Sequence, residues 1–366
     1  MRALLEDLVA IESVNPTVVT GGAGEAEIAR FVASWLDERG VEVEVDELAP
    51  GRTNVVGRVR GSGGGRSLLL NGHLDTVGLG GADAGLETRL DGSRLYGRGA
   101  YDMKASVAAM MDVAARAASE LRLAGDLIVT LVADEEALSI GTERVAATIR
   151  ADAAIVAEPT ELRLAVAHRG FVWLDVETRG RAAHGSMYAL GEDAIVRMGP
   201  VLVGLARLDA RLAERDPHSL LGRASVHASL IEGGTELSTY PDRCVVKVER
   251  RTLPGETVDG VAAELHELAP GAAVAPFFSR EPLETPRDSA VVELVSRCAE
   301  RVLGSAPDVI GVPFWTDAAL LAAAGIPTVV FGPRGEGAHA DAEWVDLDSV
   351  EQLAEILLAA AADFCA

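Results

Sequence analysis

The chain has 366 residues, of which 49% are hydrophobic and 24% are charged. This length exceeds what one hydrophobic core usually holds, so we expect two domains. A net charge of −23 at pH 7 disfavours nucleic acids and anionic membranes as partners. The three cysteines form no disulfide framework, the N-terminus is acidic where a signal peptide is apolar, and no uncharged apolar stretch approaches the roughly 20 residues that span a bilayer. We therefore expect a cytoplasmic protein.

Residues 1–169 alternate between helix and strand patterns. Residues 24–39 carry apolar side chains at helical spacing, and Gly40 ends this helix. Short apolar runs bounded by turn residues are typical of buried parallel strands. On this basis we expect strands at 41–47, 53–60, 66–71, 126–133 and 153–157, and further helices at 103–118 and 142–150.

The pattern changes between residues 170 and 283. Residues 171–178 alternate apolar and polar side chains, which is typical of an antiparallel strand. With the elements that follow, this strand gives a βαββαβ order, which predicts a small two-layer α+β domain. The other expected elements of this domain are helices at about 192–214 and 257–268 and strands near 224–232, 243–251 and 272–280.

The α/β pattern resumes at about residue 285. We therefore predict one discontinuous catalytic domain of the α/β class, residues 1–169 and 284–366, interrupted by an inserted domain at residues 170–283. The last part of the chain is expected to form helices at 288–303, 316–324 and 347–363 and strands at 308–311 and 326–331.

Five side chains that bind metals occupy related places in this pattern. His73, Glu136 and Glu158 each lie just past an apolar strand, and His339 lies a few residues beyond another. Ligands of open α/β sheets bind at the carboxyl ends of the strands, so these four side chains should converge on one edge. Asp102 opens a predicted helix and can reach the same edge. A lone residue of these types is more often structural, but order and strand position agree for all five.

The residue types indicate a metal-dependent hydrolase. Zinc accepts imidazole nitrogen and carboxylate oxygen, and two ions about 3.5–4 Å apart form a hydrolytic site. One carboxylate must bridge the ions, and Asp102 suits this role because its short side chain is held at a helix start. Glu135 lies beside a ligand and is available as a base that takes a proton from water. Asp75, two residues after His73, is placed to accept the second N–H of the imidazole.

Seven segments resemble, in the correct order and over nearly the whole chain, the signatures of one family of zinc metallopeptidases and deacylases. The family includes acetylornithine deacetylase, succinyl-diaminopimelate desuccinylase, aminoacylase and glutamate carboxypeptidase. Its most distinctive segments here read NGHLDTV, GRGAYDMK and DEE. All seven segments are residues 71–77, 97–104, 134–136, 157–160, 180–186, 251–256 and 337–340.

This resemblance implies a catalytic domain with a phosphorylase/hydrolase-like mixed sheet and an inserted α+β lid domain. It implies a dinuclear zinc site, in which Co²⁺ or Mn²⁺ could replace Zn²⁺. In that site His73 and Glu158 bind one ion, Glu136 and His339 bind the other, and Asp102 bridges them.

The resemblance also assigns residues outside the ligand set. It implies Glu135 as the general base, and a cis peptide bond between Asp102 and Met103. In the lid domain, it implies that His184 binds the scissile carbonyl and that Arg251 lies near the substrate carboxylate. The family commonly forms dimers through the lid, so His184 could act at the active site of the partner subunit. The alternatives are a structural role for His184 and a salt bridge within the lid for Arg251.

We therefore expect a hydrolase that uses metal-bound hydroxide to cleave the amide bond of an N-acyl amino acid, as acetylornithine deacetylase and succinyl-diaminopimelate desuccinylase do. The alternatives are a metallo-carboxypeptidase or dipeptidase and, more remotely, a non-catalytic protein that binds amino acids through metal. Retention of Glu135 and His184 disfavours the last. Relatives often carry Gly-Gly where this chain has Ala105 and Ser106, and we expect this departure to change the pocket without loss of metal.

Overall fold

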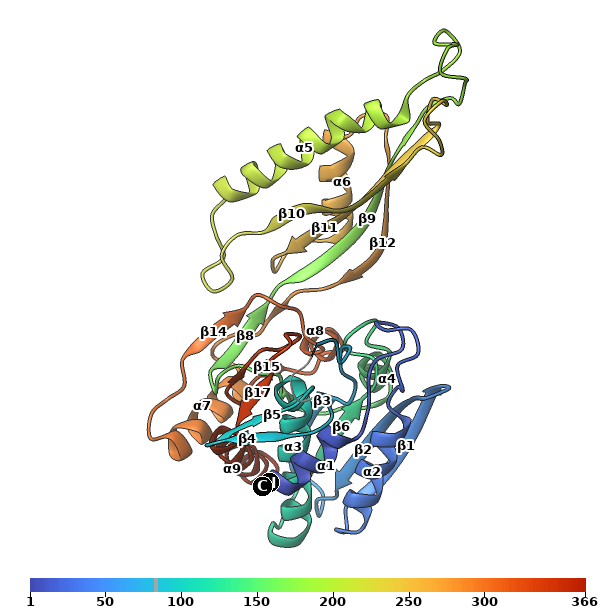
Figure 1. Cartoon of the computed structure of the whole chain (residues 1–366). Helices are drawn as coiled ribbons and strands as arrows, with labels where there is room; N and C mark the ends of the chain where they lie inside the picture. Colours follow the sequence, from blue (N-terminus) through green and yellow to red (C-terminus); the bar gives the residue numbers. More distant parts are fainter. Residues whose placement is uncertain (82–84) are drawn as a thin grey trace. The chain divides into compact units, whose positions relative to one another are not determined.

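The computed structural model describes residues 1–81 and 85–366, which form two compact units (Figure 1). The first unit consists of Met1–Val166, Thr285–Ile310 and Thr316–Ala366. The second consists of Ala167–Glu284 and the short segment Gly311–Trp315. Among the described residues, no helix combines the length and the apolar character needed to cross a bilayer.

The first unit is built on a mixed sheet, which confirms the predicted α/β class. Its four central strands are β3 (Leu68–His73), β6 (Leu127–Val132), β7 (Ala153–Val156) and β15 (Thr328–Val330), and every residue in them is buried. They run parallel in the order β6-β3-β7-β15, as expected from the short apolar runs that they contain. The other strands in this sheet are β1 (Glu42–Ala49), β2 (Arg52–Val59), β8 (Leu164–His168), β13 (Leu283–Glu284) and β14 (Val309–Val312).

Helices cover this sheet. α3 (Ala105–Glu120) contributes ten buried residues, five of them alanine, whose small side chains allow close packing. It packs against α9 (Leu347–Phe364), which in turn packs against α7 (Ala290–Leu303). The remaining helices of the first unit are α1 (Arg2–Ala10), α2 (Ala26–Asp37), α4 (Ile140–Thr148) and α8 (Ala318–Ala323).

A second, smaller sheet in the first unit was not predicted. Its strands have two or three residues each and run in the order β16-β17-β5-β4. It joins a segment near residue 95 to a segment near residue 340, so it brings together two parts of the chain that both carry predicted metal ligands. The strands are β4 (Arg89–Asp91), β5 (Arg94–Tyr96), β16 (Gly335–Glu336) and β17 (Trp344–Asp346).

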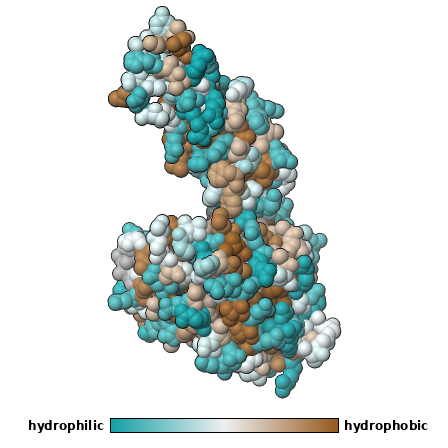
Figure 2. All heavy atoms as spheres, turned by 90° about the vertical axis from the view of Figure 1, so that its right-hand side faces the viewer, coloured by the Kyte–Doolittle hydropathy of each residue, from teal (hydrophilic) through white to brown (hydrophobic). Residues whose placement is uncertain are grey.

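The second unit is an antiparallel sheet with the strand order β10-β11-β9-β12, packed against two helices. Alternate residues of β9 face the helices and are buried, among them Val172, Leu174 and Val176. β10 lies at one edge of this sheet, and its Leu230 and Ile231 side chains are more than half exposed. Figure 2 shows patches of hydrophobic residues among hydrophilic ones on the surface that faces the viewer. The elements are β9 (Gly170–Arg179), α5 (Ala194–Glu214), β10 (Ser225–Gly233), β11 (Arg243–Thr252), α6 (Val258–Leu268) and β12 (Ala273–Arg280).

Candidate metal centre

The carboxyl ends of three neighbouring strands carry three of the predicted ligands. His73 is the last residue of β3, Glu158 lies two residues beyond β7, and Glu136 lies in the turn after β6. Asp102 lies in a short π-helical turn, η1 (Ala100–Lys104), that opens α3, and the peptide bond that follows it is cis, as expected. His339 lies in the turn between β16 and β17. Sheet topology and one unpredicted small sheet therefore bring all five side chains to one edge.

These side chains form two groups that share Asp102. His73 Nε2 lies 3.1 Å from Asp102 Oδ1 and 3.5 Å from Glu158 Oε1. His339 Nε2 lies 3.4 Å from Asp102 Oδ2 and 3.0 Å from Glu136 Oε2. In each group the candidate ligand atoms lie within 4.8 Å of one another. The two oxygens of Asp102 therefore face different histidines.

The carboxylates of these two groups favour a bound cation. Burial raises the pKa of Glu158 well above its usual value, and the Asp102 and Glu136 carboxylates raise it further while His73 opposes them. Burial, followed by the charge of Glu158, raises the pKa of Glu135 in the same way. Carboxylates this close together repel one another, and a cation bound among them would offset that repulsion.

The donor chemistry fits a divalent metal. Each group offers one imidazole nitrogen and carboxylate oxygens, which are ligands that zinc accepts. Glu136 Oε1 is buried and has no hydrogen-bond partner among the described residues, and a buried polar atom left without a partner is costly. The hydrogen bonds that the His339 imidazole donates to the carboxylates of Asp102 and Glu136 raise its pKa to about 10, so a metal bound there would displace a proton. The residues present therefore fit divalent cations.

The sequence model of the family described as Peptidase family M20/M25/M40 matches residues 69–363. The chain belongs to this family. It is 31% identical to acetylornithine deacetylase from Myxococcus xanthus, over all of this chain and 97% of that protein, and 30% identical to the protein of that name from Proteus mirabilis, over 99% and 96%.

Solved structures of other hydrolases share the fold. An aminopeptidase from Bacillus cereus superposes with a TM-score of 0.82 at 20% identity, over 99% of this chain and 97% of that one. An M20 family metallo-carboxypeptidase from Sulfolobus solfataricus gives 0.78 at 18% identity, over 99% and 98%. Family membership makes the protein a hydrolase of amide bonds. The family is metal-dependent, and the chain carries two groups of side chains that could each hold a metal ion.

Asp75 supports this M20 site in a different way from the one predicted. His73 Nδ1 lies 2.9 Å from the backbone oxygen of Asp75, while the carboxylate Oδ1 is 3.6 Å away. The carboxylate instead accepts the backbone N–H groups of Glu135 and Glu136, each at 3.1 Å. Because a carbonyl can only accept, Nδ1 carries the proton and Nε2 is left available to bind a metal. The second N–H of the imidazole is therefore accepted by the carbonyl of Asp75, and the carboxylate of Asp75 orients the glutamate turn.

A buried ion network beneath the glutamate turn was missed from the sequence. Arg52 donates to both oxygens of Glu25 at 2.7 Å and to Asp134 Oδ1 at 2.7 Å. Asn15 donates to Asp134 Oδ1 at 3.0 Å and to Asp75 Oδ2 at 2.7 Å. The network fixes Asp134, whose φ of 72° lies in the left-handed region that aspartate tolerates. Its members lie up to 119 residues apart, so no local spacing could reveal it.

His184 and Arg251 both lie in the second unit. His184 is exposed beyond the end of β9, with Nδ1 2.7 Å from Ser186 Oγ. Arg251 lies near the end of β11, where Nε is 3.0 Å from Glu249 Oε1 and the guanidinium lies over the Phe171 ring. The structure thus contains the lid salt bridge that was the alternative for Arg251. The roles of both residues toward substrate stay predictions.

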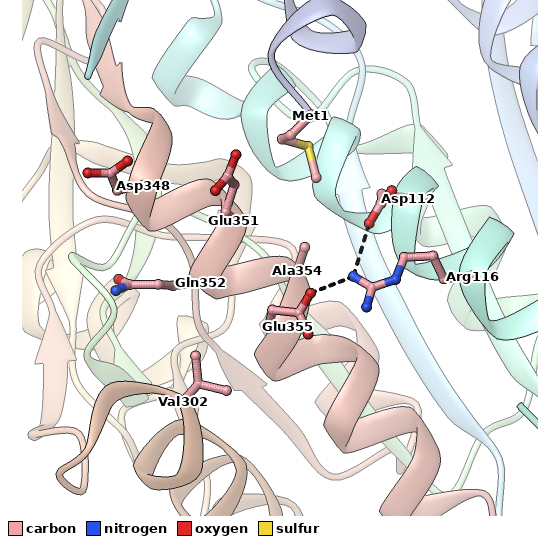
Figure 3. A pocket seen from close by; sticks show the side chains of 9 residues that line it. All are labelled: Met1, Asp112, Arg116, Val302, Asp348, Glu351, Gln352, Ala354 and Glu355. Carbon is pink, nitrogen blue, oxygen red and sulfur yellow. Dashed lines mark hydrogen bonds and ion pairs between the residues drawn. The ribbon is translucent and has the colours of Figure 1, made fainter. Parts of the chain in front are cut away.

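A separate open pocket of about 530 Å³ lies in the first unit between α3, α7 and α9 (Figure 3). Its lining includes none of the predicted ligands. Arg116, which lines it, is already paired with Glu355 at 2.6 Å and Asp112 at 3.5 Å. The pocket therefore plays no part in the metal centre.

Proposed function

We propose that the protein uses two divalent metal ions, with zinc as the first candidate, to hydrolyse the amide bond of an N-acyl amino acid. In this proposal His73 and Glu158 hold one ion, Glu136 and His339 hold the other, and Asp102 bridges them. The observation that carries it is the placement of Asp102, whose two oxygens face different histidines. The names of the relatives at about 30% identity, both acetylornithine deacetylases, favour a deacylase over a carboxypeptidase or dipeptidase.

The residues would divide the reaction between them. When bound, the ions would polarise the substrate carbonyl and lower the pKa of a water molecule. Glu135 would take the proton of the attacking water and deliver it to the leaving amine. Its backbone N–H is fixed by Asp75 at 3.1 Å, and the neighbouring Glu136 is directed toward His339. A turn held at both N–H groups keeps base and ligand in separate roles.

The second unit would act as a lid and as a dimerisation domain. β10 is an edge strand of its sheet, and Leu230 and Ile231 on it are 59% and 53% exposed. Val196 on α5 is 70% exposed. An edge strand with exposed apolar side chains favours pairing with another chain. We propose a homodimer through this edge, with His184 stabilising the developing oxyanion and Arg251 binding the substrate carboxylate.

A hydrolysis panel tests the proposal. N-acetyl, N-succinyl and N-formyl amino acids and dipeptides are assayed after reconstitution of the metal-free protein with zinc, cobalt or manganese, and bound metal is counted in parallel. We expect two ions per chain and the highest kcat/KM on an N-acyl amino acid. A preference for dipeptides, or for release of the C-terminal residue of peptides, would identify a dipeptidase or a carboxypeptidase in place of the deacylase. Metal binding without any turnover would support a non-catalytic binding protein.

Two variants test whether Asp102 bridges the two ions or only adds negative charge to the site. Asp102→Asn keeps the shape but removes the charge that both groups share, so both ions should be lost. Glu158→Gln should weaken the ion beside His73 first. Two tightly bound ions in Asp102→Asn would rule out the bridge.

A further inference from the structure

Glu343 is a buried carboxylate that collects four hydrogen bonds from the segment carrying Asp102. Its Oε1 accepts the backbone N–H groups of Tyr101 at 2.9 Å and Asp102 at 3.0 Å. Its Oε2 accepts the N–H of Gly99 at 3.0 Å and Arg98 Nη1 at 2.7 Å. One side chain therefore holds the backbone on which the shared carboxylate is carried.

Arg98 extends this contact to the turn that carries His339. Its Nη2 donates to the backbone oxygen of Ala340, the next residue after His339, at 2.8 Å. Its Nε donates to the backbone oxygen of Gly78 at 3.1 Å. Both Arg98 and Glu343 are almost completely buried, with side chains 3% and 2% exposed. The pair thus joins the Asp102 segment to the His339 turn.

His339 needs such an anchor more than the other ligands do. His73 ends a fully buried strand, but the His339 side chain is 54% exposed and its backbone has a φ of 64°. The turn itself is closed by a hydrogen bond from the Ala340 N–H to the Gly337 oxygen at 2.9 Å. Groups that orient ligands typically change metal affinity about 10- to 100-fold when they are removed.

We propose that Arg98 and Glu343 are positioning residues that set the distance between Asp102 and His339 and thereby the affinity for the ion shared by Glu136 and His339. The inference rests on the proposed two-ion function. The proposal concerns the ion of Glu136 and His339 in particular. Arg98 and Glu343 contact the segments that carry Asp102 and His339, and of these two ligands only Asp102 would also bind the ion held by His73 and Glu158.

Glu343→Gln is the decisive variant. An amide offers one oxygen and places an NH₂ group where two N–H donors now point, so two of the four hydrogen bonds are lost. Metal-free protein is titrated with Zn²⁺ against a competing chelator, and with Co²⁺ while its visible absorption is recorded. We expect affinity for one ion to fall about 10- to 100-fold, with a changed Co²⁺ spectrum for that ion and a much smaller effect on the other.

Two further variants complete the test. Glu256→Gln is the matched control. Glu256 lies in the second unit, and its carboxylate likewise accepts hydrogen bonds from an arginine side chain, Arg250 at 2.5 Å, and from a backbone N–H, that of Leu253 at 2.8 Å. It should leave both metal affinities unchanged. Arg98→Lys keeps the charge but cannot reach Glu343, Ala340 and Gly78 together, and should weaken the same ion as Glu343→Gln.

The outcomes distinguish this inference from the proposed function. Fewer than two ions in the wild-type protein would overturn the proposed function, and the inference with it. Two ions in the wild type and unchanged affinities and Co²⁺ spectra in folded Glu343→Gln and Arg98→Lys would overturn the inference alone. Failure of both variants to fold, judged by circular dichroism with and without metal, would assign the pair to folding and likewise overturn it.

Discussion

Mixing two inactive variants, His184→Ala and Glu135→Gln, should restore activity if His184 acts at the site of a partner subunit. Within the second unit, Arg251 pairs with Phe171 at one end of β9, and Arg243 pairs with Arg179 at the other. Eight residues separate Arg243 from Arg251, and at about 3.3 Å per residue this distance is roughly 26 Å. His184 lies still farther along, beyond the end of the strand.

A small substrate cannot cover that distance. An extended dipeptide spans about 7 Å, so one second unit cannot offer both His184 and Arg251 to the same substrate. If both contact the substrate, they come from different subunits. The structure of the second unit therefore favours action of His184 in trans over action in cis together with Arg251.

The magnitude of the recovery follows from counting sites. Random exchange of equal amounts makes about half of the dimers mixed, and each mixed dimer has one site with an intact Glu135 and an intact His184 from its partner, so activity should reach about a quarter of wild type. The assay compares kcat/KM of the mixture with each variant incubated alone, and native mass spectrometry confirms exchange. Absence of recovery in a mixture with proven exchange would refute the reasoning and place His184 in cis or outside catalysis.

Three further predictions concern the chemistry and its support. Glu135→Gln should lower kcat by about 10²–10⁴, roughly 3–5 kcal/mol of barrier, with metal content retained, whereas Glu136→Gln should lose metal in a way that excess zinc partly reverses; metal analysis with the reverse pattern would exchange the two roles. Arg251→Lys should lower kcat/KM about 10- to 150-fold through loss of a contact of roughly 1.5–3 kcal/mol, and equal turnover of the methyl ester of the best substrate would contradict carboxylate recognition. Arg52→Met leaves buried carboxylates unpaired, so urea unfolding should show a loss of about 3–5 kcal/mol, and an unchanged midpoint would show that the network carries no net stability.

The parts of the fold that could be predicted from the sequence are those with a clear local pattern. The buried strands β3, β6, β7 and β15 contain short apolar runs, and α3 and α9 are long enough to show helical spacing. The small sheet of β4, β5, β16 and β17 was missed because strands of two or three residues are too short to show a pattern in the sequence. α1 was also missed, although four of its nine residues are buried.

The candidate ligands could be predicted because chemistry and strand position constrain them together. The residues that hold them could not. Arg98 and Glu343 are 245 residues apart, and Arg52 and Asp134 are 82 apart. Their contacts depend on how distant segments are brought into register, and a buried arginine or glutamate has the same sequence appearance as an exposed one.

Ser106 shows where a departure from the family pattern acts in the structure. Ala105 and Ser106, which stand where relatives often carry glycine, are both fully buried. The Ser106 hydroxyl donates to the backbone oxygen of Ala157 at 2.5 Å, immediately before Glu158. Its effect therefore falls on the backbone that carries a ligand, where the hydroxyl satisfies a buried carbonyl. An effect of this pair on the substrate pocket stays a prediction, and it would act through the backbone next to Glu158.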